Sequence, residues 1–367
     1  MAQPMISLVS VGKTFPGAAR PAVTDLSLDM SPGETTVLVG PSGCGKTTTL
    51  RMINRLVEPT TGTIYCDGID TATIEAYELR RRMGYVIQQV GLFPHRTVSQ
   101  NIATVPLLLG WDNTAIARRV KELLDLMGLD QEMADRYPAE LSGGQQQRVG
   151  VARALAADPP VLLMDEPFGA VDPLVRGRLQ DELLALQGKL GKTIVFVTHD
   201  IDEAIKLGDR VAILNTGGVL EQFARPEEIL REPRSPFVEK FLGGERGLKR
   251  LSLLRVADIK LEPGPVVSSQ ASVADAMAVM STHGIDWVVV VDGGRLRGWV
   301  GEADLSGLAT AGDAESRPFL VRVGPDSTLR SALDAIVSHR TQVAVVTEGD
   351  TYLGMLSLTH LHEELVT

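Results

Sequence analysis

Cysteine, aromatic side chains and long apolar runs are all scarce in this chain of 367 residues. Its two cysteines, Cys44 and Cys66, are too few for a disulfide framework, and a reduced, cytosolic compartment is the simplest interpretation. Aromatics make up 4%, so a core drawn from the 44% hydrophobic residues must be mainly aliphatic. No run approaches the roughly 20 apolar residues of a membrane-spanning helix, and no signal peptide is expected at the N-terminus.

A positive charge excess is also missing. Lysine and arginine number 36 against 46 aspartates and glutamates, which gives a net charge of −10. Because nucleic-acid binding needs a basic footprint, no nucleic-acid partner is expected. At about 100–200 residues per domain, the length suggests two or three domains.

Strand-like and helical stretches alternate along the first two thirds of the chain, which predicts an α/β fold with a largely parallel core sheet. The helical periodicity is clearest over 114–127, where Ile116, Val120 and Leu123 share one face. Strands are expected at 5–9, 26–30, 35–39, 83–87, 161–164, 193–197 and 210–214, and further helices at 47–57, 175–190 and 202–207.

Beyond a glycine-rich break, the last third contains an internal repeat. A constant offset of 56 residues aligns 273–277 with 329–333 and Gly298 with Gly354. This predicts two copies of a helix–strand–strand module that pack together, since each is too small to bury its faces alone. We therefore expect one domain at 1–242, a linker at 243–262, and a paired module at 263–367 with copies at about 263–311 and 316–367.

A phosphate-binding loop follows the strand at 35–39 and precedes a helix, as the motif requires. Its glycines let backbone N–H groups surround phosphate oxygens, and the helix N-terminus adds partial positive charge. Lys46 is expected to reach the β- and γ-phosphates and Thr47 to ligate Mg²⁺. The expected ATP-binding residues of this loop are Gly40, Pro41, Ser42, Gly43, Cys44, Gly45, Lys46, Thr47 and Thr48.

Two carboxylates end the apolar strand at 161–164. Asp165 is expected to hold Mg²⁺, and Glu166 to act as the general base on the attacking water. A third motif, Leu141, Ser142, Gly143, Gly144 and Gln145, is a glycine turn that opens a helix.

With this pentapeptide between the other two motifs, residues 5–242 resemble the ABC ATPase family. The resemblance implies that the pentapeptide acts in trans, on the γ-phosphate held by a second copy in a head-to-tail dimer. It also implies a catalytic and Mg²⁺-sensing Gln88, a switch histidine at His199, a dimer-loop Asp172 and an adenine-stacking Phe15. The implied fold is an α/β P-loop NTPase domain with a parallel core sheet, an antiparallel β subdomain and a helical subdomain. Val171 and Cys44 are mild departures.

The repeat resembles a tandem CBS module, also α/β. With one P-loop, no inserted coiled coil and no membrane span, the chain is most similar to stand-alone importer ATPases. The CBS pair and residues 85–95 resemble those of the quaternary-amine group, which imports glycine betaine, choline, carnitine or proline. This implies partners: integral membrane permease subunits, whose coupling helix would enter a groove that includes 91–98, and indirectly an extracytoplasmic substrate-binding protein. The expected location is the cytoplasmic face of the inner membrane, peripherally bound.

CBS pairs commonly bind adenine nucleotides, and the resemblance places a ribose-binding aspartate at Asp304. Each copy departs from that motif: Gly301 replaces a hydroxyl residue in the first, and His360 replaces the aspartate in the second. The pair could thus bind a nucleotide, or serve dimerisation or ionic-strength sensing. For the whole chain the alternatives are import of another small solute, a soluble ABC switch ATPase without a permease, and a CBS sensor whose ATPase is vestigial.

Overall fold

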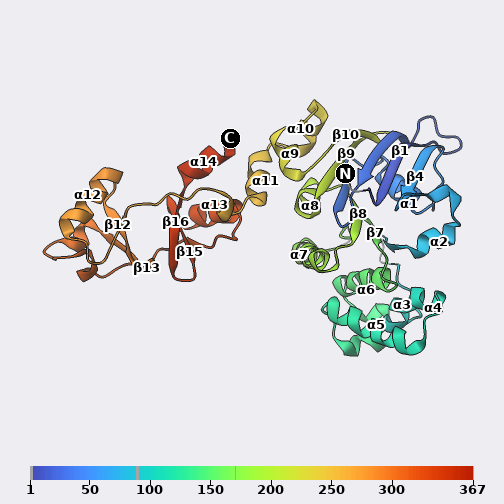
Figure 1. The fold of residues 1–367 in the computed structure, drawn as a ribbon, viewed down its shortest axis with the longest axis horizontal. Coiled ribbons are helices and arrows are strands. Elements are labelled where there is room, and N and C mark those ends of the chain that lie inside the picture. Colours follow the sequence, from blue (N-terminus) through green and yellow to red (C-terminus); the bar gives the residue numbers. More distant parts are fainter. Residues whose placement is uncertain (1–2, 88–90, 170, 367) are drawn as a thin grey trace. The chain divides into compact units, whose positions relative to one another are not determined.

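The computed structural model describes residues 3–87, 91–169 and 171–366 of the chain. The chain forms two compact units, Met1–Gly244 and Glu245–Thr367 (Figure 1). None of the described helices is both long and apolar enough to cross a bilayer.

The core of the first unit is a six-stranded sheet in the order β10-β9-β3-β8-β7-β6. Only β10 is antiparallel to its neighbour, and the other pairs are parallel. Every residue of β3, β7 and β8 is buried, as expected for parallel strands covered on both faces. The predicted α/β fold with a largely parallel sheet is therefore confirmed. The strands are β3 (Thr35–Val39), β6 (Met83–Val86), β7 (Val161–Asp165), β8 (Thr193–Thr198), β9 (Arg210–Asn215) and β10 (Val219–Ala224).

An antiparallel sheet in the order β2-β1-β4-β5 accompanies this core. Along β2, buried and exposed residues largely alternate, so one face packs inward and the other meets solvent. The strands are β1 (Ile6–Lys13), β2 (Val23–Met30), β4 (Thr61–Cys66) and β5 (Ile69–Asp70).

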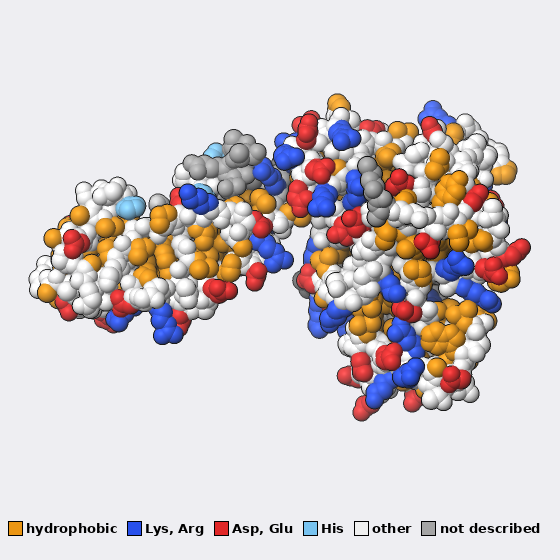
Figure 2. Space-filling view, viewed as in Figure 1, with side chains coloured by type: hydrophobic (Ala, Val, Ile, Leu, Met, Phe, Trp, Pro, Cys, Tyr) orange, Lys and Arg blue, Asp and Glu red, His pale blue; other side chains and the backbone are white. Residues whose placement is uncertain are grey.

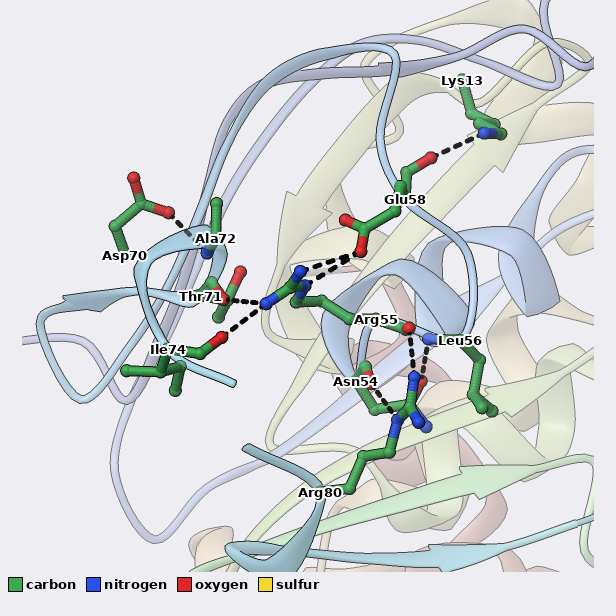
Figure 3. A network of polar contacts seen from close by, with 10 residues as sticks. All are labelled: Lys13, Asn54, Arg55, Leu56, Glu58, Asp70, Thr71, Ala72, Ile74 and Arg80. Atoms are coloured by element: carbon green, nitrogen blue, oxygen red, sulfur yellow. Dashed lines mark hydrogen bonds and ion pairs between the residues drawn. The ribbon is translucent and has the colours of Figure 1, made fainter. Parts of the chain in front are cut away.

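Helix α1 (Lys46–Ile53) follows the phosphate loop and contacts β7 and β8. It ends earlier than the predicted residue 57, because Arg55 adopts a left-handed backbone with φ of 52°. Figure 3 shows the polar network at this end. The Arg55 guanidinium donates to the carbonyls of Thr71 and Ile74 at 2.9 and 2.6 Å, and so ties α1 to the segment after β5.

A cluster of short helices carries the pentapeptide motif (Figure 1). Helix α6 contacts α3, α5 and the core strand β6. The predicted amphipathic helix at 114–127 is α5, which Asp112 caps by accepting from the Ala115 amide. The remaining helices of this unit are α2 (Ala76–Arg81), α3 (Val98–Ile102), α4 (Thr104–Leu108), α5 (Asn113–Leu126), α6 (Gly143–Leu155), α7 (Pro173–Leu190), α8 (Ile201–Leu207), α9 (Pro226–Arg231) and α10 (Pro236–Leu242).

The second unit has one mixed sheet in the order β11-β12-β13-β16-β15-β14. Its halves repeat at the predicted offset of 56 residues, which confirms the internal repeat: Gly298 and Gly354 even share a φ of 149°. The elements are β11 (Val266–Val267), α12 (Val273–His283), β12 (Trp287–Asp292) and β13 (Arg295–Gly301), then β14 (Arg322–Val323), α13 (Leu329–Ser338), β15 (Val343–Glu348), β16 (Thr351–Ser357) and α14 (Leu358–Val366).

Segments that precede each copy pack on the opposite copy. Glu262, before the first copy, exchanges backbone hydrogen bonds with Met355 of β16. Arg317, which precedes β14 near the start of the second copy, does the same with Trp299 of β13. The segment 243–262, expected as a linker, contains helix α11 (Arg246–Leu253), which contacts α13 and α14. Leu251 is fully buried in the core of the second copy, so most of this segment belongs to the second unit.

Candidate functional site

The loop between β3 and α1 depends on its glycines. A Cβ atom at Gly40 would lie 2.1 Å from the Leu214 carbonyl oxygen, and one at Gly45 would lie 2.5 Å from that of Ala22. Gly45 also has a φ of 100°, which disfavours other residues. The first turn of α1 contains no acidic side chain. The loop and the helix N-terminus thus form the anion-binding arrangement that the motif predicts.

Lys46 is buried at the base of this loop, with 5% of its surface exposed. Its ammonium donates to the carbonyl oxygens of Gly40 and Pro41 at 2.8 and 3.0 Å and lies 3.7 Å from the Cys44 sulfur. Among the described residues it forms no ion pair with a carboxylate. A buried cation whose recorded partners are all neutral suits an anionic ligand.

Asp165, at the end of β7, connects three elements. Its Oδ1 accepts a hydrogen bond of 2.8 Å from the Thr47 hydroxyl of α1. Its Oδ2 accepts one of 3.4 Å from the hydroxyl of Tyr85 on β6. Burial raises the pKa of the Tyr85 hydroxyl, and the nearby Asp165 carboxylate raises that pKa further. Sequence reasoning paired Thr47 with Asp165 but missed Tyr85, which the pairing of β6 with β7 brings to the site.

Glu166 follows Asp165 in an unusual backbone conformation. Its φ is 44°, in the left-handed region, while its amide donates to the Val197 carbonyl at 2.9 Å. Its Oε2 lies 3.1 Å from Nδ1 of His199, which follows the neighbouring strand β8. The Glu166 side chain is 19% exposed and that of His199 57% exposed. The structure therefore brings these two predicted residues together at the carboxyl edge of the sheet.

The pentapeptide motif forms the N-terminus of α6. Ser142 caps the helix by accepting from the Gln145 amide at 3.3 Å, while the Gln145 side chain accepts from the Ser142 amide at 2.9 Å. Leu141 is buried, whereas Ser142 and Gly143 are exposed. In the described part of the chain, no hydrogen bond joins these residues to the phosphate loop. The motif thus faces solvent, open to a partner.

Two other expected positions lie outside this cluster. Phe15 is 40% exposed, with the Lys13 ammonium 5.2 Å from its ring centroid. Asp172 is exposed just before α7. Gln88 lies outside the described residues.

In the second unit, Asp304 already has two partners. Its Oδ1 accepts from the Arg317 guanidinium at 2.6 Å, and its Oδ2 accepts from the Gly301 amide at 3.0 Å. Asp304 and Arg317 line a mainly polar cavity of about 390 Å³. In the second copy, His360 donates its amide to the Ser357 hydroxyl at 3.1 Å, so Ser357 caps the N-terminus of α14.

The first-unit site has the donor chemistry of a magnesium–nucleotide site. Mg²⁺ prefers oxygen ligands and is usually held by one or two carboxylates together with substrate phosphates. The Thr47 hydroxyl and the Asp165 carboxylate supply such oxygens beside the phosphate loop. In the described ranges, no three His, Cys, Asp or Glu side chains form a metal cluster.

Family comparisons agree with this geometry. The family model "ABC transporter" matches residues 23–169, and the model "CBS domain" matches residues 256–309 and 312–367. A solved dimeric ATP-binding cassette in a post-hydrolysis state with ADP and Pi is 35% identical, with a TM-score of 0.54. That match covers 60% of this chain and 99% of the cassette.

Two curated relatives cover most of the chain. The osmoprotectant import ATP-binding protein OsmV of Salmonella typhimurium is 43% identical, over 98% of this chain and 96% of the relative. The glycine betaine/carnitine/choline transport ATP-binding protein OpuCA of Bacillus subtilis is 50% identical, over 78% of this chain and 76% of the relative. The chain therefore belongs to the ABC transporter family, as an ATP-binding subunit of the osmoprotectant-importer group with a C-terminal pair of CBS domains.

Proposed function

We propose that the chain hydrolyses MgATP through the residues around Asp165 and so powers import of a quaternary-amine osmoprotectant. The observation that carries the proposal is the joint placement of Thr47 with Asp165 and of Glu166 with His199 at one edge of the sheet. Lys46 would bind the β- and γ-phosphates, and the remaining loop residues would donate backbone N–H groups. Phe15 would stack on adenine.

Within this site, Glu166 acts as the general base that takes a proton from the attacking water. His199 holds the Glu166 carboxylate and contacts the γ-phosphate. Thr47, Asp165 and Gln88 would hold Mg²⁺, which when bound neutralises phosphate charge. Tyr85 positions Asp165 through its hydroxyl.

A second copy completes the site. The exposed Ser142 and Gly143, with the half-buried Gly144 and Gln145, would contact the γ-phosphate bound by the other subunit, in a head-to-tail dimer with Asp172 at the interface. The solvent-facing N-terminus of α6 supports this arrangement, because its backbone N–H groups suit an anion. A dimeric cassette among the solved relatives supports it as well.

An apolar surface suits a permease. Phe93, Leu107 and Leu108 are 39%, 52% and 72% exposed, and Figure 2 shows hydrophobic side chains gathered over α4. The buried Asn101 side chain fixes the loop at Phe93, whose amide and carbonyl it binds at 2.8 and 3.2 Å. We place the chain at the cytoplasmic face of the inner membrane, held there by permease subunits. An extracytoplasmic binding protein would deliver the solute to these permease subunits.

Uptake by cells would test the substrate class. The chain, expressed with its own permease in a strain that lacks osmoprotectant uptake, should restore accumulation of labelled glycine betaine, choline, carnitine or proline at high osmolarity. A Glu166→Gln version should not restore it. ATP hydrolysis without uptake of any of these solutes would instead favour another solute or a soluble switch ATPase.

The CBS pair would regulate this activity by binding an adenine nucleotide near Asp304. The polar cavity beside Arg317 supports that proposal. Calorimetric titration of the full chain with AMP should give saturable binding that Asp304→Ala abolishes. Binding that the substitution leaves intact would reject the Asp304 site, and a salt-dependent activity without binding would favour an ionic-strength sensor.

A further inference from the structure

A cavity of about 330 Å³ lies in the first unit between α6, β7 and α7, away from the phosphate loop. Its volume falls in the range of about 300–1,000 Å³ that is typical of small-molecule sites. Most of its lining is apolar, including Val151 of α6, Met164 of β7 and Leu183 of α7, with Phe168 between the last two elements. Such a lining suits the apolar body of a small ligand.

One end of the cavity is polar and offers donors. Gln147 of α6 lines it with only 3% of its surface exposed, and its amide nitrogen has no hydrogen-bond partner among the described residues. The next residue, Arg148, also lines the cavity, and its Nε is buried without a partner in the described part of the chain. An unpaired buried donor is costly, so both atoms would gain from an acceptor brought by a ligand.

The charges at this end favour an anion. One oxygen of Glu182 receives both guanidinium groups, from Arg148 at 2.7 Å and from Arg178 at 3.1 Å. Two cations therefore share one carboxylate. Asp125 and Lys189 also line the cavity, so its charged side chains are three cations, Arg148, Arg178 and Lys189, and two carboxylates, Asp125 and Glu182. A carboxylate supplied by a ligand would balance the remaining positive charge and could accept from an unpaired donor.

We propose that this cavity binds a small molecule with an apolar body and one carboxylate, held by Gln147 and Arg148. A ligand bound in this cavity would change the rate of ATP hydrolysis, because the cavity lining is connected to the site. Helix α6 begins at the pentapeptide, and Met164 and Pro167 flank Asp165 and Glu166. Only this regulatory part rests on the proposed ATPase function, since binding itself can be measured without nucleotide.

Calorimetric titration of the full chain with octanoate, without nucleotide, tests the site. We expect saturable binding, one octanoate per chain, with a dissociation constant below about 1 mM. Val151→Phe should fill the cavity and weaken binding at least ten-fold. Val337→Phe, the same change at an exposed position of the second unit, should leave binding unchanged.

A second variant separates recognition from folding. Gln147→Met keeps the length of the side chain but removes the unpaired amide, so it should not destabilise the free protein. It should weaken octanoate about ten-fold and leave the binding of 1-octanol, which has no carboxylate, unchanged. Absence of saturable octanoate binding overturns the proposal, and so does binding with the parent chain's affinity by Val151→Phe and Gln147→Met variants that both fold. Octanoate binding with an unaltered ATPase rate overturns only its regulatory part.

Discussion

His199 and Glu166 lie on the ends of adjacent strands, with Nδ1 of the imidazole 3.1 Å from Oε2 of the carboxylate. The Glu166 backbone adopts a φ of 44° at this point, a conformation that non-glycine residues occupy at functional sites. The contact fixes the carboxylate at the same edge of the sheet as Asp165. A positioned base of this kind gives the first two predictions.

Glu166→Gln should keep the shape of the site but remove its general base. We expect ATP hydrolysis to fall by roughly 10²–10⁴-fold, while ATP binding persists and the closed dimer accumulates. Steady-state turnover and size-exclusion chromatography with ATP measure the two effects. Asp202→Asn, on the exposed surface of α8, is the matched control. Full turnover in Glu166→Gln would remove Glu166 as the base.

His199→Ala should lower kcat and leave the KM for ATP nearly unchanged, because the ring orients Glu166 and contributes little to holding the nucleotide. A decrease of about 10–100-fold would match the loss of one positioned group. His283→Ala, which removes an exposed histidine of the second unit, should have no effect. If KM rose while kcat held, the histidine would be a binding residue and the Glu166 contact incidental.

Tyr85→Phe should weaken the binding of Mg²⁺, since it deletes one hydrogen bond to Asp165. A bond of this kind contributes about 0.5–1.5 kcal/mol, so the Mg²⁺ concentration for half-maximal ATPase should rise about two- to ten-fold. Tyr77→Phe, at a tyrosine that is 54% exposed, is the control. An unchanged Mg²⁺ titration would show that the 3.4 Å contact does not position Asp165.

The site shows what the sequence could and could not supply. The phosphate loop is local: β3, the glycine turn and α1 are consecutive, so their order alone indicates the chemistry. The Tyr85 contact is not local, because it depends on the parallel register that sets Tyr85 beside Leu163 of β7. No motif marks that register.

The expected linker was misjudged for a similar reason. Residues 243–262 have the glycine-rich start and basic character of a connector, and the repeat itself begins later. Leu251 and Val256 nevertheless fill the core of the second copy. The segment before each copy packs on the opposite copy, and this packing leaves no periodic pattern in the sequence. Only the three-dimensional structure identifies which copy each segment joins.

Cys66 should make stability depend on alkaline pH. Burial raises the pKa of its thiol to about 11. The pKa of the thiol is higher in the folded chain than in the unfolded chain. The contribution of the protonated thiol to the free energy of unfolding is therefore complete below pH 9 and is lost as pH rises toward 11, by about 3 kcal/mol at most. Urea unfolding at pH 8 and pH 10.5 should thus show a larger loss of unfolding free energy in the parent than in Cys66→Ala. Equal losses would contradict a protonated buried thiol.

The exchanged segments predict where the second unit can be cut. A fragment of residues 245–367 should fold, whereas one of residues 263–367 should not, because it lacks Leu251 and Val256. Removing one large buried side chain costs about 2–5 kcal/mol, and losing two exceeds what a domain of this size can spare. Circular dichroism melts of the two fragments measure the difference.

Single substitutions in the full chain give a matched test of the same idea. Leu251→Ala should lower the melting temperature of the second unit, and Leu248→Ala, one turn earlier on α11 and 38% exposed, should not. Equal cooperative melting of both fragments, together with an unaffected Leu251→Ala, would return residues 245–262 to the role of a linker. If the two fragments and the two substitutions do differ in melting as expected, α11 is part of the CBS core. A displacement of α11 would then alter the packing of that core directly.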